Sequence, residues 1–135
     1  MHEKITGGEL PSVLALAFIG DARHSLYVRR MLVGRGISKS GELNELSLGY
    51  VTAQAQAEAF GRIEHLLLDD EREVFKRAAN STHLNRPKHA SVTDYRYATG
   101  FEAVIGMLAW IKDEERIEEL LREAHKENDK NDSED

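Results

Sequence analysis

The chain has 135 residues, enough for one compact domain with its own hydrophobic core but too few for a second. It contains no cysteine, which excludes a disulfide framework and a thiolate metal site. The N-terminus has no apolar signal core, and the longest uncharged runs are shorter than the ~18 residues that a membrane span needs. We therefore expect a cytoplasmic protein without a membrane span.

The formal net charge of −6 is unevenly distributed along the chain. Residues 114–135 hold ten acidic and four basic side chains, so the preceding 113 residues are neutral as a whole. Within that neutral part, the segment from Lys76 to Tyr97 carries five basic side chains against one acidic side chain. A local basic surface attracts phosphate even on an acidic molecule, so this segment is a candidate for binding nucleic acid.

The first predicted helix runs from about Leu10 to Val33. Pro11 lies near its start, where the missing N–H does no harm, and the glycines at 34 and 36 favour an end. Gly20 stands inside the helix, where glycine costs about 1 kcal/mol relative to alanine. We interpret Gly20 as the point of close approach to another helix.

Asp21 stands in the middle of an apolar stripe of this helix. At about 100° per residue, the stripe contains Leu10, Leu14, Ala17, Ser25, Val28 and Leu32. We expect Asp21 to be buried there, and an unpaired buried charge costs several kcal/mol. The carboxyl group is then protonated, paired with a base or bound to a cation, unless Asp21 is an ordinary hydrogen-bonded core residue.

The sequence pattern in the middle of the chain predicts further helices and one long loop. The segment Glu42–Ile63 reads as one or two helices with a pivot near Gly49, and Asp69–Ala79 as a short charged helix. The segment Asn80–Ala90 has no periodicity and contains a proline, so we expect a loop that carries function.

Two more helices follow the loop. Ser91 or Thr93 caps one that ends near Lys112, and Asp113 or Glu114 begins a last amphipathic helix. We place a single domain at residues 1–124 and a disordered acidic tail at residues 125–135. No segment alternates in the manner of a strand, and the expected fold class is all-α.

Glu102 repeats the anomaly of Asp21 in the helix that starts near Ser91. Its stripe is made mostly of small residues, and Gly100 and Gly106 lie close by. Because glycine has no side chain, two helices that contain it can cross closely enough for Asp21 and Glu102 to face each other. A divalent cation between the two carboxylates removes their mutual repulsion. Oxygen ligands with open positions favour Mg²⁺ or Mn²⁺ over zinc. The alternative is two unrelated core acids.

Several of these segments carry a resemblance to a known family. The run Leu16–Ala22, LAFIGDA, resembles the signature helix of the ribonuclease III endonuclease domain, and Phe101–Gly106, FEAVIG, resembles its second acidic motif. The similarity is closest to Mini-ribonuclease III, the compact bacterial relative that lacks a double-stranded-RNA-binding domain. It covers roughly residues 14–112, and its specificity lies in the order and spacing of the motifs.

The resemblance implies a ribonuclease III endonuclease domain-like helical fold and a homodimer that cleaves double-stranded RNA with Mg²⁺, for which Mn²⁺ substitutes. The implied substrate is the precursor of large-subunit (23S) ribosomal RNA, and the implied products carry a 5′-phosphate. By position, Asp21 and Glu102 are the expected catalytic metal ligands. The expected RNA-binding residues are Lys76, Arg77, Asn80, Arg86, Lys88 and Arg96.

The sequence departs from the family patterns in two respects. Full-length ribonuclease III enzymes have two further acids where this chain has Ala17 and Thr99, although Mini-ribonuclease III also lacks them. Ala79 stands where the family often has an arginine, which removes one expected contact to RNA. Two other functions remain open: a catalytically silent helical dimer that binds structured RNA or a ribosomal precursor, and a helical protein-interaction module.

Overall fold

The computed structural model describes residues 9–81 and 90–126, and within these ranges it contains helices and no strand. The helices are α1 (Val13–Gly34), α2 (Ser40–Val51), α3 (Ala53–Ile63), the short 3₁₀ turn η2 (Glu64–Leu66), α4 (Asp69–Asn80), α5 (Val92–Trp110) and α6 (Glu114–Ala124). This confirms the predicted all-α class. None of the helices in the described part is both long enough and apolar enough to cross a membrane.

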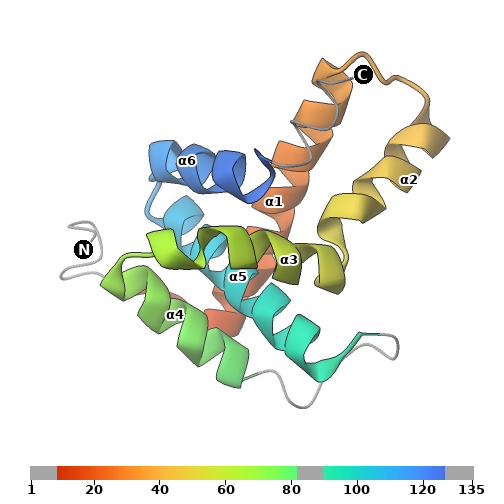
Figure 1. Ribbon diagram of the computed structural model, residues 1–135. Coiled ribbons are helices and arrows are strands. Elements are labelled where there is room, and N and C mark those ends of the chain that lie inside the picture. The colour runs from red at the N-terminus through yellow and green to blue at the C-terminus, as the bar shows by residue number, and fades with distance from the viewer. Residues whose placement is uncertain (1–8, 82–89, 127–135) are drawn as a thin grey trace.

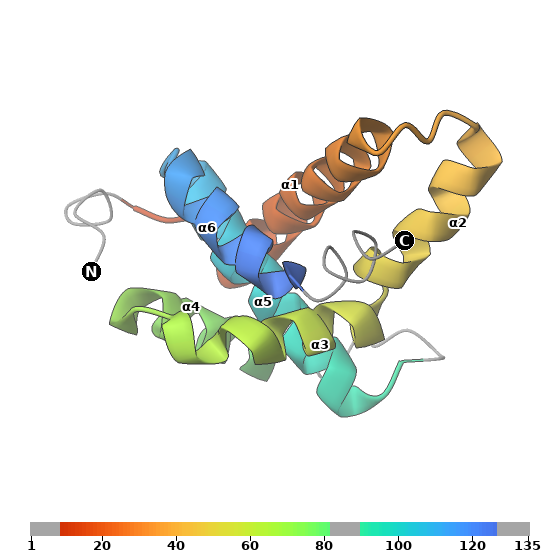
Figure 2. The same ribbon diagram turned by 45° about the horizontal axis from the view of Figure 1, so that its top comes forward.

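Helix α5 forms the centre of the molecule. Figures 1 and 2 show α1, α3, α4 and α6 arranged around it, and each of these helices contacts it. The main core includes Phe60, Phe101 and Leu120, which are fully or almost fully buried. The far half of α1 and helix α2 leave this bundle as an arm with a second small cluster, formed by Val28, Leu32 and Tyr50.

The helix ends differ from the predicted ones by a few residues. The break between α2 and α3 falls at Thr52 and not at Gly49, because Thr52 is extended and its hydroxyl accepts a hydrogen bond from the Ala55 N–H at 3.3 Å. Ser91 caps α5 through the Asp94 N–H, and Asp113 caps α6 through the Arg116 N–H. Polar caps thus set these boundaries.

Two glycines allow α1 and α5 to cross with their backbones in contact. A Cβ atom built on Gly20 lies 1.7 Å from the backbone oxygen of Glu102, and one built on Gly106 lies 1.7 Å from that of Leu16. No side chain fits at either position, which confirms the close approach predicted at Gly20. The crossing brings the Asp21 segment of α1 beside the Glu102 segment of α5.

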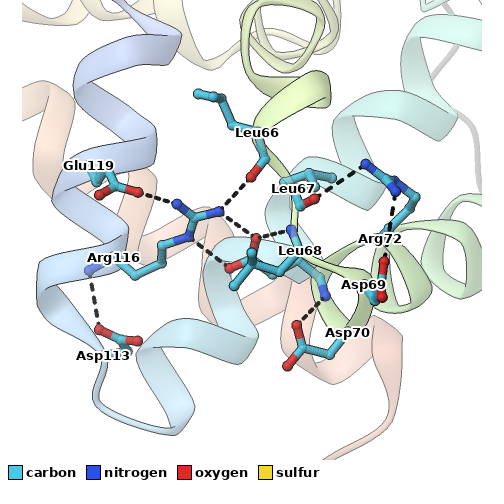
Figure 3. Close-up of polar contacts among 10 residues, drawn as sticks. Leu66, Leu67, Leu68, Asp69, Asp70, Arg72, Asp113, Arg116 and Glu119 are labelled. Carbon is cyan, nitrogen blue, oxygen red and sulfur yellow. Dashed lines mark hydrogen bonds and ion pairs between the residues drawn. The ribbon is translucent and has the colours of Figure 1, made fainter. Parts of the chain in front are cut away.

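A buried ion pair joins α4 to α6. Glu71 is completely buried, and Arg116 donates to both of its carboxylate oxygens, at 2.8 and 2.9 Å. Figure 3 shows Arg116 reaching from α6 toward the turn before α4, where it also donates to the Leu66 carbonyl oxygen at 2.8 Å. The Leu68 N–H donates to Glu71 as well, at 2.9 Å, so the buried carboxylate is well satisfied.

We predict that Arg116→Met lowers the free energy of unfolding by about 3–5 kcal/mol, because it leaves the Glu71 charge buried without its cation. Arg122→Met on the same helix is the matched control, since Arg122 is exposed and its replacement is expected to change stability by less than about 0.5 kcal/mol. Urea unfolding followed by circular dichroism measures both variants. Equal losses in the two would contradict a stabilising role for the ion pair.

Candidate active site

Asp21 and Glu102 line one cleft where α1 crosses α5. The cleft is also lined by Ala17, Thr99 and Tyr95, and by the apolar side chains of Leu14 and Phe18. The two carboxyl groups come within hydrogen-bonding reach of each other. The predicted convergence of these two acids, one from each helix, is therefore present in the structure.

The environment of Glu102 favours its protonated form. Burial raises the pKa of Glu102 to about 8, the hydrogen bond and negative charge of Asp21 add to the increase, and a hydrogen bond from Gln56 opposes it. At neutral pH and without a cation, burial and the neighbouring Asp21 therefore favour the proton-bearing form of Glu102.

The expectation that Asp21 is buried is wrong. Asp21 is exposed, and so are its stripe neighbour Leu14 and the nearby Phe18, with exposed fractions of 45% and 81%. Helix α1 turns a different face to the core, the face of Leu16, Gly20 and His24. That face overlaps part of the stripe around Asp21, so that Ala17, Val28 and Leu32 are buried whereas Leu14 and Asp21 are exposed. The side chain of Glu102 is the more enclosed of the two acids.

Glu102 gives the metal-free protein a distinctive pH dependence. The folded state keeps the Glu102 proton between pH 4.5 and about 8, where an unfolded chain loses it, so this group's contribution to stability falls as the pH rises through that window. We predict that Glu102→Gln stabilises the metal-free protein increasingly from pH 5.5 to 8, by at most about 1.4 kcal/mol per pH unit.

Urea unfolding in chelator at several pH values measures this difference between the wild type and the variant. Glu45→Gln is the control, because Glu45 is exposed on α2, away from the cleft. A difference between wild type and Glu102→Gln that stays constant with pH would show that Glu102 titrates normally.

The structure also places four of the six residues expected to bind RNA. Lys76, Arg77 and Asn80 are exposed on the last turns of α4, and Arg96 is exposed on the first turns of α5. Arg96 donates to the Asn80 side-chain oxygen at 2.7 Å and to the Ala79 carbonyl oxygen at 3.1 Å, which joins the two helix ends. The other two expected residues, Arg86 and Lys88, lie outside the described residues.

Sequence reasoning missed a group of buried polar side chains behind the cleft. His24 and Gln56 are buried on α1 and α3, and His125 is buried at the C-cap of α6. The sequence predicts a disordered tail from residue 125, but His125 is buried. Residues 127–135 lie outside the described part. The sequence does contain one indication that His24 is buried: it lies one helical turn after Gly20, on the face that meets α5.

Comparison with known proteins finds relatives that match the part of the chain that forms the cleft. Residues 14–112 match the Ribonuclease III domain family. The chain is 41% identical over 110 residues to a Mini-ribonuclease 3 of Streptococcus pneumoniae, covering 80% of this chain and 86% of the relative. It is 40% identical over 115 residues to a Mini-ribonuclease 3 of Brevibacillus brevis, covering 85% and 86%.

A solved structure has the same fold as this chain. The crystal structure of a Fusobacterium nucleatum protein has a TM-score of 0.76 at 30% sequence identity and covers 90% of this chain and 96% of its own. The matched residues 14–112 include both carboxylates of the cleft and both glycines of the helix crossing. The chain therefore belongs to the ribonuclease III domain family, in which it groups with the Mini-ribonuclease 3 proteins.

Proposed function

We propose that this protein is a metal-dependent endoribonuclease that cleaves double-stranded RNA. The observation that carries the proposal is the pairing of Asp21 and Glu102 at the α1–α5 crossing, in a chain that belongs to a ribonuclease family. Two carboxyl groups that compete for one proton form a site that a cation can occupy in its place.

The donor set of the cleft fits a hard divalent cation, Mg²⁺ with Mn²⁺ as a substitute. Mg²⁺ is commonly held by one or two carboxylates while water and substrate phosphate complete its coordination. Within residues 9–81 and 90–126, no third histidine or acid joins Asp21 and Glu102 to form a larger cluster. When bound, the ion supplies an activated water and charge stabilisation for hydrolysis of a phosphodiester.

The residues of the cleft have distinct parts in this reaction. Glu102, the more enclosed of the two, and Asp21, which is exposed, would together hold the ion through their carboxylate oxygens. The Thr99 hydroxyl donates to the Tyr95 carbonyl oxygen at 2.9 Å and adds no charge. Breaking the bond to the 3′-oxygen leaves a 5′-phosphate on one product and a 3′-hydroxyl on the other.

We assign the exposed surface of Lys76, Arg77, Asn80 and Arg96 to the RNA backbone. Duplex RNA is recognised mainly through its shape, phosphates and 2′-hydroxyl groups, which suits guanidinium, ammonium and amide donors. The substrate we propose is a precursor of large-subunit (23S) ribosomal RNA in the cytoplasm. Because the contacts proposed here are mainly ionic contacts to phosphate and the family resembled lacks a double-stranded-RNA-binding domain, binding should be modest and strongly dependent on salt.

We also propose that the active form is a homodimer. Exposed apolar side chains lie along α1, namely Leu14, Phe18, Leu26 and Val33, and an exposed apolar stripe of this kind is typical of a surface that a partner covers. A second copy that covers it gives two clefts, one for each RNA strand. Sedimentation equilibrium tests this, with a dimer expected for the wild type and a monomer for Phe18→Asp.

The decisive experiment compares cleavage of a duplex RNA and of its separate strands, in Mg²⁺ and in chelator. We expect cleavage of the duplex alone, in Mg²⁺ alone, with 5′-phosphate ends. Salt-sensitive binding of the duplex without cleavage would overturn the proposal in favour of a catalytically silent RNA-binding dimer. Neither binding nor cleavage would point to a protein-interaction module.

A further inference from the structure

A line of buried side chains connects the end of α6 to the candidate metal ligand Glu102. The Nε2 atoms of His125 and His24 lie 2.9 Å apart, and His24 Nδ1 lies 3.2 Å from Gln56 Nε2. Gln56 Nε2 in turn donates to Glu102 Oε2 at 3.4 Å. The two histidines and Gln56 are each at most 2% exposed, so water does not complete these contacts.

With the Gln56 amide nitrogen directed toward His24, the protons along this line have one consistent arrangement. Burial, with repulsion from His125, lowers the pKa of His24 to about 3; burial, with repulsion from Arg62, lowers the pKa of His125 to about 4. Both rings are therefore neutral at neutral pH, and each carries one N–H. Because an amide nitrogen only donates, His24 Nδ1 accepts from Gln56, and His24 Nε2–H donates to His125 Nε2.

We infer that Gln56 is a positioning residue of the candidate metal site, and that His24 and His125 fix which way its amide points. The inference rests on the proposed function for the purpose of the site. With its nitrogen toward His24 and Glu102, Gln56 donates to the ligand carboxylate and favours the charged, metal-binding form. With the amide reversed, the carbonyl oxygen of Gln56 would lie next to Glu102. That oxygen can only accept a hydrogen bond, so it would favour the protonated form of Glu102.

The surroundings hold the two imidazole rings in place. The edge of Phe101 meets His24 at a ring distance of 5.1 Å, and Tyr27 and Tyr50 contact His125 at 5.9 and 5.3 Å. The end of α6 is fixed by Arg62, which donates to the Ala124 carbonyl oxygen at 2.6 Å. The orientation of the Gln56 amide is therefore set by packed groups from α1 and α6.

Replacement of Gln56 tests its action on the metal site. Gln56→Leu removes the amide at similar volume, and Gln54→Leu is the control, because Gln54 is exposed on the same helix. We expect Gln56→Leu to weaken Mn²⁺ binding about 10- to 100-fold, measured by electron paramagnetic resonance without RNA. The Mg²⁺ concentration for half-maximal cleavage should rise by a similar factor, with a smaller change in kcat, and Gln54→Leu should behave as the wild type.

A spectroscopic measurement on the wild type tests the proton arrangement without any variant. Nitrogen-15 spectra of the histidine rings should show His24 neutral with its proton on Nε2, and His125 neutral with its proton on Nδ1, from pH 8 down to pH 5.5. A proton on His24 Nδ1 would overturn the inference, because Gln56 would then have to present its oxygen to the ring.

The outcomes separate this inference from the proposed function. Metal-dependent cleavage with equal Mn²⁺ affinity in Gln56→Leu and Gln54→Leu overturns the positioning role alone. Selective loss of Mn²⁺ affinity in Gln56→Leu, in a protein that cleaves no RNA, supports the positioning role and overturns the nuclease. A wild type that binds no Mn²⁺ overturns both.

Discussion

Glu102→Gln is expected to reduce duplex cleavage in saturating Mg²⁺ by about a thousandfold or more. The amide keeps the size of the side chain but cannot supply the negative charge that Asp21 and Glu102 together offer a cation. A bound metal contributes several kcal/mol of charge stabilisation, and each 1.36 kcal/mol corresponds to a factor of ten in rate. The fold should survive, because the amide has the size of the carboxyl group and Glu102 already carries a proton near neutral pH.

The experiment combines single-turnover cleavage with duplex binding and thermal unfolding. Asp21→Asn should show the same loss, and the double variant should be little worse than either single variant, because residues that hold one ion act as a unit. Glu45→Gln should cleave at the rate of the wild type. A Glu102→Gln protein that retains more than about a tenth of the wild-type rate would contradict the proposed site.

Gly20→Ala and Gly106→Ala are expected to cause the largest losses of stability. Each new methyl group would lie 1.7 Å from a backbone oxygen of the opposite helix, and a backbone atom cannot rotate away as a flexible side chain can. The two helices must separate along the contact that anchors the core. We expect each substitution to cost more than about 4 kcal/mol, which is enough to unfold many domains of this size.

Gly61→Ala is the matched control for this prediction. Gly61 lies in α3 with no atom within 4 Å of its built Cβ, so alanine there should stabilise the helix by about 0.5–1 kcal/mol. The soluble yield and the urea midpoint of the three variants give the comparison. Native-like unfolding of Gly20→Ala would show that the crossing can open without penalty.

Much of the site was predictable from the sequence because its evidence is local. Gly20 next to Asp21, and Glu102 between Gly100 and Gly106, place a close helix contact beside each acid. The exposure of Asp21 was not predictable, because a stripe of apolar residues does not reveal what covers it. The buried face of α1 covers only part of the stripe, so that Val28 and Leu32 are buried while Leu14 and Asp21 are exposed.

The supporting residues could not be predicted for a different reason. Gln56, His24 and His125 come from three helices that are far apart along the chain, and each looks unremarkable in its own segment. Their contacts exist only after α1, α3 and α6 have packed around α5. The same holds for Arg116, which meets Glu71 across 45 residues of sequence.

The backbone contact at the α1–α5 crossing has a consequence for ion selection. Where helices meet through long side chains, the distance between their axes can vary as those side chains change rotamer. At Gly20 and Gly106 the two main chains are in direct contact, with no side chain between them. The spacing of the two backbones that carry the carboxylates is thereby set during folding, before any ion arrives. A small cation that requires near-octahedral geometry gains from such a preorganised frame, whereas a larger, more adaptable ion such as Ca²⁺ gains little.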